Sequence, residues 1–136
     1  MRIIVTGYIA QYPLGGVSWD YFQYVLGLHQ LGHQVHYIED TGQWPYNPKE
    51  GGISPECSFN VGYLAAIFDH YGLGDRWAYH FPWEDQWFGF SESTRKDILS
   101  SADLLINVSG SLGRPEPRGS FHRRARNAPA RSPGAP

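Results

Sequence analysis

The chain has 136 residues, 41% of them hydrophobic, and a formal net charge of −2 at pH 7, as expected for one globular domain. No apolar run approaches the ~20 residues of a membrane-spanning helix, and the N-terminus lacks the basic and apolar regions of a signal peptide. Cys57 is the single cysteine, which excludes a disulfide framework and a cysteine zinc site, and we therefore expect a cytoplasmic protein.

The first 40 residues predict a strand, a glycine loop, a helix and a second strand. Arg2–Thr6 is a β-branched run typical of a buried parallel strand. From a cap at Ser18 to a stop at Gly32, apolar residues recur at helical spacing. This stripe comprises Tyr21, Phe22, Val25, Leu26, Leu28 and Leu31. Val35–Ile38 is the second predicted strand, and the acidic pair Glu39–Asp40 follows at its carboxyl end, where open parallel sheets bind ligands.

The next segments alternate between loops and short elements. Thr41–Glu56 has three prolines and three glycines and predicts a long surface loop. We expect a helix from a Ser58 cap to a stop at Gly72. Trp77–Phe81 predicts a short strand, and Pro82–Phe90 predicts an aromatic-rich loop.

The last elements complete the predicted domain. A third helix is expected from Ser91 or Ser93 to about Ser101, and Leu104–Val108 predicts a buried strand that ends at Ser109 and Gly110. This order of elements favours an α/β fold with a Rossmann-like, doubly wound parallel sheet and helices on both faces. We assign residues 1–113 to this domain.

Residues 114–136 differ from the domain in composition and charge. Residues 1–113 hold five Lys or Arg and twelve Asp or Glu, for a formal charge of −7, whereas the tail holds six Arg and one Glu, for +5. The tail has no Leu, Ile, Val or Lys, which predicts disorder. Either it is a native basic arm or it is translated from a wrong frame in GC-rich DNA, and we favour the second explanation.

Several segments together point to a family. The run Gly15-Gly16-Val17, ahead of a helix that ends Leu31-Gly32-His33 and a strand VHYIED, resembles the N-terminal domain of GT-B glycosyltransferases. The segments GLGDRWAYH and ADLLINVSG are also similar to members of that group. The resemblance covers roughly residues 1–113.

The resemblance implies a function and a missing partner. GT-B enzymes move a sugar from a nucleotide-sugar donor to an acceptor across two Rossmann-like domains. The N-terminal domain mainly holds the acceptor, which is a small molecule or a glycan, and the C-terminal domain holds most of the donor. By this resemblance the chain is the acceptor-side half, truncated and inactive without its C-terminal domain.

Candidate binding residues lie at the predicted ligand edge. Gly15 and Gly16 allow close backbone approach beside a helix N-terminus that presents N–H groups to an anion; the resemblance implies that this anion is the donor diphosphate, and the alternative is a plain turn. Ser109 and Gly110 occupy the equivalent place after the last strand and could bind through backbone N–H groups. Trp19 would face the crevice.

Three acidic residues have both a functional and a structural interpretation. Asp20 is a candidate general base or a partner of the helix dipole. Glu39 and Asp40 could bind sugar hydroxyls or act as a base, and the alternative is that they are solvated loop residues.

Aromatic and histidine side chains complete the candidate set. The loop aromatics could stack on a sugar or aglycone, or simply pack the loops; they are Trp44, Tyr46, Trp83 and Trp87. His80 is a candidate general base, whereas His36 alternates within a strand and is expected to be structural. Because no histidine has metal-ligand spacing, we predict no metal and no cofactor.

Two other functions stay open. Val5-Thr6-Gly7 followed by an acidic pair loosely resembles a dinucleotide-binding fingerprint, although the G-x-G-x-x-G spacing is missing. The other alternative is a binding module that uses the basic tail. Nucleic acid is an unfavourable partner for it, because the domain itself is strongly acidic.

Overall fold

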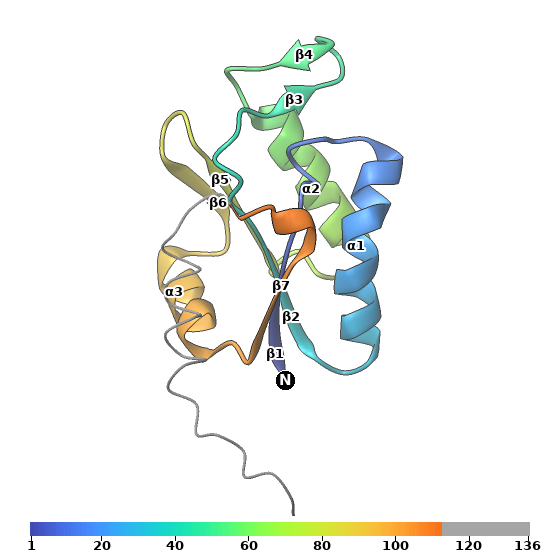
Figure 1. Cartoon of the computed structure of the whole chain (residues 1–136), viewed down its shortest axis with the longest axis vertical. Coiled ribbons are helices and arrows are strands. Elements are labelled where there is room, and N and C mark those ends of the chain that lie inside the picture. Colours follow the sequence, from blue (N-terminus) through green and yellow to red (C-terminus); the bar gives the residue numbers. More distant parts are fainter. Residues whose placement is uncertain (113–136) are drawn as a thin grey trace, which may run out of the picture.

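The computed structural model describes residues 1–112 (Figure 1). It is a mixed α/β structure with a five-stranded sheet, a two-stranded hairpin and three α-helices. In chain order the elements are β1 (Arg2–Thr6), α1 (Gly15–Gln30), β2 (Gln34–Glu39), β3 (Tyr46–Asn47), β4 (Gly52–Ile53), α2 (Ser58–His70), β5 (Trp77–Phe81), β6 (Gln86–Gly89), α3 (Glu92–Ser101) and β7 (Leu104–Asn107). The predicted basic tail lies outside the described residues.

The sheet has the strand order β6-β5-β2-β1-β7. Strands β5, β2, β1 and β7 are parallel, and β6 is antiparallel to β5. The chain builds outward from β1 through β2 to β5 and β6, and then crosses back so that β7 pairs with the other side of β1. The carboxyl ends of β1 and β7 therefore form a topological switch point, the place where open α/β sheets bind ligands.

Both faces of the sheet are covered (Figure 1). Side chains alternate along each strand: Ile3, Val5 and Tyr37 pack with Phe22 of α1 and Phe68 of α2 in a first core. On the opposite face, Ile4 and Ile38 pack with Ile98 of α3 and with Ala102, the C-cap of that helix, in a second core. The predicted helices on both faces are confirmed.

The start of α1 differs from the prediction. The helix begins at Gly15, with Leu14 as the N-cap and no side-chain cap. Ser18 is instead a buried residue inside the helix, and its hydroxyl donates to the Leu14 carbonyl oxygen at 2.9 Å. Asp20 lies beyond the first turn, and Leu31, expected in the apolar stripe, is 75% exposed. The predicted stop is confirmed, because Gly32 has a φ of +89°.

The other two helices follow their sequence signals closely. In α2 the N-cap is Cys57 rather than Ser58, and Gly72 follows the helix end with a φ of +72°. In α3 the cap at Ser91 is confirmed, since its hydroxyl accepts from the Thr94 backbone N–H at 3.2 Å. None of the helices within residues 1–112 is long and apolar enough to cross a membrane.

The loops hold more structure than expected. The predicted loop 41–56 contains the β3–β4 hairpin, and the predicted aromatic loop contains β6. Strand β7 is at the edge of the sheet with Leu104 38% exposed, so the expectation of a buried strand there is wrong. Val108–Gly110 forms a short 3₁₀ turn after it.

Candidate functional site

Two of the predicted site residues meet at the carboxyl edge of the sheet. Asp40 directly follows β2, and His80 lies near the end of the neighbouring strand β5. Because Ile38 is paired with Ala78, residues two positions further along both strands come side by side on the same face. The His80 Nδ1 atom lies 3.2 Å from an Asp40 carboxylate oxygen, and both side chains are almost fully buried.

A second carboxylate contacts the other nitrogen of the imidazole. The His80 Nε2 atom lies 2.6 Å from a carboxylate oxygen of Asp85, whose side chain is 77% exposed. Asp85 belongs to the turn between β5 and β6 and has a φ of +48°, a conformation that non-glycine residues seldom adopt. His80 therefore lies between a fixed, buried carboxylate and one on an exposed turn. The Asp40 contact is at ion-pair distance, although the His80 Nδ1 atom forms no hydrogen bond with the described residues. A buried carboxylate beside an imidazole is an arrangement suited to general acid–base chemistry.

An aromatic and a cationic side chain flank this histidine. The Trp87 ring lies with its centroid 4.9 Å from that of His80, and the Arg95 guanidinium stacks 3.9 Å from the Trp87 ring centroid. Trp87 is thus packed on the α3 side of the sheet and is not a free stacking surface.

Glu39 has a different surrounding, although it is adjacent to Asp40 in the sequence. Its side chain points to the opposite face of the sheet and is fully buried. The carboxylate accepts from the backbone N–H groups of Ala10 at 3.0 Å and Gln11 at 2.7 Å, and from the Tyr37 hydroxyl. Glu39 therefore fastens the loop between β1 and α1, and neither it nor Asp40 is a solvated loop residue.

The burial of Glu39 changes its acidity. Burial raises the pKa of Glu39 to about 7, against the opposing effect of the hydrogen bonds that it accepts. The same buried contact raises the pKa of Tyr37, first through burial and then through the neighbouring Glu39 charge. Asn60 reinforces the loop, since its side-chain amide donates to the carbonyl oxygens of Ala10 at 2.7 Å and Tyr46 at 2.8 Å.

The topological switch point is a small hydroxyl and amide cluster. The Thr6 hydroxyl donates to the Asn107 side-chain oxygen at 2.9 Å and accepts from the Ser111 hydroxyl at 2.9 Å. The exposed Ser109 hydroxyl accepts from Tyr21 at 3.3 Å. Ser109 and the exposed Gly110 have φ values of +56° and +62°. The chain turns sharply at the place where Ser109 and Gly110 were expected to bind a ligand.

The glycine requirement falls on a different residue from those predicted. Gly15 and Gly16 are exposed, have ordinary helical backbone, and would leave an added methyl group in open space. At Gly7, by contrast, a Cβ atom would lie 2.6 Å from a ring carbon of Tyr21. Close packing of the loop against α1 thus depends on Gly7. The sequence pattern had directed attention to the glycine pair at residues 15 and 16 instead.

The remaining predicted residues are spread over separate surfaces. Trp19, 51% exposed, and the exposed Asp20 are on α1, which packs on the face of the sheet opposite to His80. The two candidate bases, Asp20 and His80, therefore belong to different layers. Trp83 is 61% exposed and contacts Trp44, with 3.8 Å between ring centroids, while Tyr46 lies against Tyr12.

The residue that sequence analysis missed is Asp85. Its position between the aromatic runs of two strands was a possible signal for a hairpin turn, but its contact with His80 depends on the antiparallel pairing of β5 and β6. In the part of the chain that the structure describes, no three His, Cys, Asp or Glu residues could together hold a metal ion.

Comparisons with protein-family models, with curated proteins and with solved structures gave no match for this chain.

Proposed function

We propose that this chain is a Rossmann-like, acceptor-side domain of a GT-B-type glycosyltransferase, in which His80 is the general base and Asp40 orients its imidazole. The observation that carries the proposal is the contact of the buried Asp40 with His80 at the carboxyl edge of β2 and β5. That edge is where open α/β sheets bind substrates. The resemblance of residues 1–113 to GT-B N-terminal domains supplies the reaction class.

In the proposed reaction the acceptor hydroxyl attacks the anomeric carbon of a nucleotide sugar. The new bond forms from the hydroxyl oxygen, the bond to the diphosphate oxygen breaks, and the hydroxyl proton passes to His80 Nε2. The donor would be held mainly by a C-terminal domain that these residues do not include. The single cysteine is compatible with work in the reducing cytoplasm.

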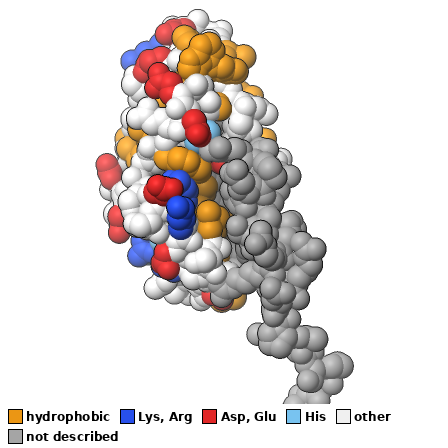
Figure 2. All heavy atoms as spheres, turned by 90° about the vertical axis from the view of Figure 1, so that its left-hand side faces the viewer, with side chains coloured by type: hydrophobic (Ala, Val, Ile, Leu, Met, Phe, Trp, Pro, Cys, Tyr) orange, Lys and Arg blue, Asp and Glu red, His pale blue; other side chains and the backbone are white. Residues whose placement is uncertain are grey.

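The acceptor hydroxyl would take the position that Asp85 occupies. Asp85 contacts Nε2 at 2.6 Å, and because its side chain is 77% exposed, rotation of that side chain alone would free the Nε2 atom. Trp83, in the same turn, offers an exposed ring to a sugar or aromatic acceptor. Hydrophobic side chains also gather near the upper end of the left-hand side of the molecule (Figure 2).

The contacts of Glu39 weigh against the dinucleotide-binding alternative. In that alternative an acid at the end of the second strand binds ribose hydroxyls. Here Glu39 is fully buried, and its two oxygens already accept from Ala10, Gln11 and Tyr37. The alternative that uses the basic tail concerns residues outside those described.

Saturation-transfer NMR with three probes tests the proposal: phenyl β-D-glucopyranoside, UDP-glucose and NAD⁺. We expect transfer to the glucoside, weaker transfer to UDP-glucose because the donor would be held mainly by the C-terminal domain, and none to NAD⁺. His80→Gln should weaken glucoside binding about three- to tenfold, the effect of one hydrogen bond, while the exposed control Asp75→Asn leaves it unchanged. Binding of NAD⁺ in preference to the glucoside, or glucoside binding indifferent to His80→Gln, would refute the proposal.

A further inference from the structure

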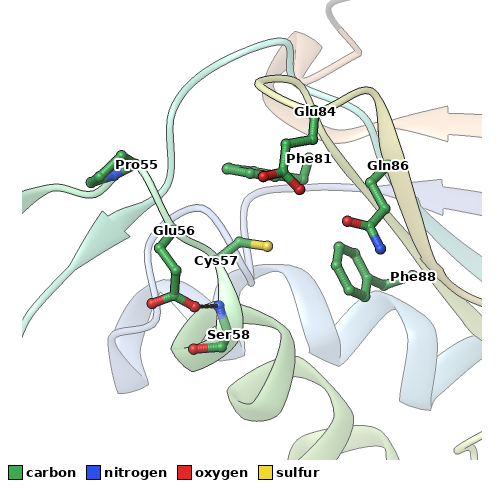
Figure 3. A pocket seen from close by; sticks show the side chains of 8 residues that line it. All are labelled: Pro55, Glu56, Cys57, Ser58, Phe81, Glu84, Gln86 and Phe88. Atoms are coloured by element: carbon green, nitrogen blue, oxygen red, sulfur yellow. Dashed lines mark hydrogen bonds between the residues drawn. The ribbon is translucent and has the colours of Figure 1, made fainter.

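A pocket of about 200 Å³ opens where the start of α2 meets the turn between β5 and β6 (Figure 3). It is lined by Pro55, Glu56, Cys57, Ser58, Phe81, Glu84, Gln86 and Phe88. Phe81 and Phe88 belong to the core that α1 and α2 cover, whereas His80 is on the other face of the sheet. The pocket is therefore separate from the Asp40–His80 pair.

The charges around this pocket are negative. Glu56 and Glu84 are exposed at its rim, and its lining includes no Lys, Arg or His. Glu56 accepts from the Ser58 backbone N–H at 2.5 Å, and hydrogen bonding to Ser58 lowers its pKa. Glu56 therefore stays ionised at neutral pH and already occupies the N-terminus of α2, so the site suits a cation and not an anion.

The interior of the pocket is lined by two phenylalanine rings and a thiol. The Cys57 side chain points into the space between the two phenylalanine rings (Figure 3); Cys57 is 6% exposed and forms no disulfide. Burial, and then the nearby Glu56 charge, raise the pKa of the Cys57 thiol to about 11. The thiol is therefore largely protonated at physiological pH and is a poor nucleophile that reacts slowly. A ligand in this pocket would be held without a covalent bond.

We propose that this pocket binds a small organic ammonium ion, such as a quaternary alkylammonium group. Aromatic side chains attract such ions through their ring faces, and the Phe81 and Phe88 rings line the same pocket as the two rim carboxylates, with the Cys57 side chain between the rings (Figure 3). Alkyl groups on the cation would fill the apolar interior beside Cys57, and its charge would face Glu56 and Glu84. The volume of the pocket matches a small headgroup and not a nucleotide.

Choline and its neutral isostere 3,3-dimethylbutan-1-ol are the probes for the test. We expect choline, titrated into the full chain, to shift the amide resonances of Cys57 and Glu84 in NMR spectra, with a Kd in the millimolar range. The isostere should bind at least about fivefold more weakly than choline, because it fills the same volume without the charge. Since Cys57 is the single thiol, choline should also slow its reaction with a neutral thiol reagent.

Matched charge variants complete the experiment. Glu84→Gln should weaken choline binding about threefold, which is the scale of an exposed ion pair. Glu50→Gln, the same change at an exposed residue outside the pocket, should leave binding unchanged. The proposal is overturned if the isostere binds as tightly as choline, if Glu84→Gln and Glu50→Gln have equal effects, or if choline leaves the pocket resonances and Cys57 reactivity unaltered.

Discussion

Glu39 and His36 should drive the stability of this protein in opposite directions as the pH changes. Burial raises the pKa of Glu39 from 4.5 to about 7. Burial, and then the charges of Arg76 and Arg2, lower the pKa of His36 from 6.5 to about 4. The two residues lie on opposite faces of β2 and contact different elements, because Glu39 holds the β1–α1 loop and His36 packs on Phe90.

The sign of each effect follows from proton linkage. The folded state binds a proton at Glu39 more tightly than the unfolded chain does, so its contribution to stability is complete below pH 4.5 and is lost as the pH rises to about 7. The folded state binds a proton at His36 less tightly, so that contribution is complete above pH 6.5 and is lost as the pH falls to about 4. At about 1.4 kcal/mol per pH unit, each effect amounts to about 3 kcal/mol.

Urea unfolding at several pH values separates the two residues. In the wild-type chain the opposing slopes of Glu39 and His36 cancel between pH 4.5 and 6.5. In Glu39→Gln the free energy of unfolding should rise by about 3 kcal/mol relative to the wild type from pH 4.5 to 7, above a constant loss from the weakened loop contact. In His36→Leu it should fall by a similar amount relative to wild type from pH 4 to 6.5. If either variant parallels the wild-type curve, the assigned burial effect is wrong.

Two backbone features give further predictions. Gly89 has a φ of +95°, and an added Cβ atom would lie 2.2 Å from the Trp77 carbonyl oxygen, so Gly89→Ala should cost about 3 kcal/mol in urea unfolding. The matched control Gly62→Ala lies inside α2 with open space around it, and it should instead stabilise the folded chain by about 0.5–1 kcal/mol. An equal loss of unfolding free energy in both variants would contradict this prediction. Ser91→Ala removes the hydroxyl that accepts from Thr94 and should cost about 1 kcal/mol, and an unchanged urea midpoint would show that the cap is not needed.

The sequence predicted those elements whose pattern is local. Strands β1 and β5 were recognised from β-branched and aromatic runs, and cap chemistry placed the start of α3 at Ser91 or Ser93, of which Ser91 is the observed cap. Strand β6 was missed because Trp87 packs in the core on one face and Phe88 in the core on the other. With both faces apolar, the alternation that marks a half-buried strand is absent.

The start of α1 does not follow the helix and capping propensities of its residues. Glycine is a weak helix former, and Ser18 is a favourable cap, so the sequence favoured a start at Ser18. Gly15 and Gly16 are exposed in the first turn, and Ser18 is bonded through its hydroxyl to both Leu14 and Tyr63. The Tyr63 contact depends on the position of α2 and is not visible in local sequence.

The candidate site could be predicted only in part for the same reason. Asp40 and His80 were recognisable as residues at strand ends, but their contact depends on the register between β2 and β5. The opposite roles of Glu39 and Asp40 depend on which face of the sheet each residue occupies. In the sequence the two residues form one acidic pair that follows the predicted strand, and their separation appears only when β2 is extended to Glu39 and side chains alternate between its faces.

The most direct test of the proposed catalytic pair is a crystal structure of the chain with phenyl β-D-glucopyranoside. We expect a sugar hydroxyl within about 3 Å of His80 Nε2, with Asp85 displaced from that atom and the Asp40 contact unchanged. A glucoside bound elsewhere, with Asp85 still in contact with Nε2, would contradict the proposed role of His80 as a general base. His80 would then be a structural residue that contacts the two carboxylates.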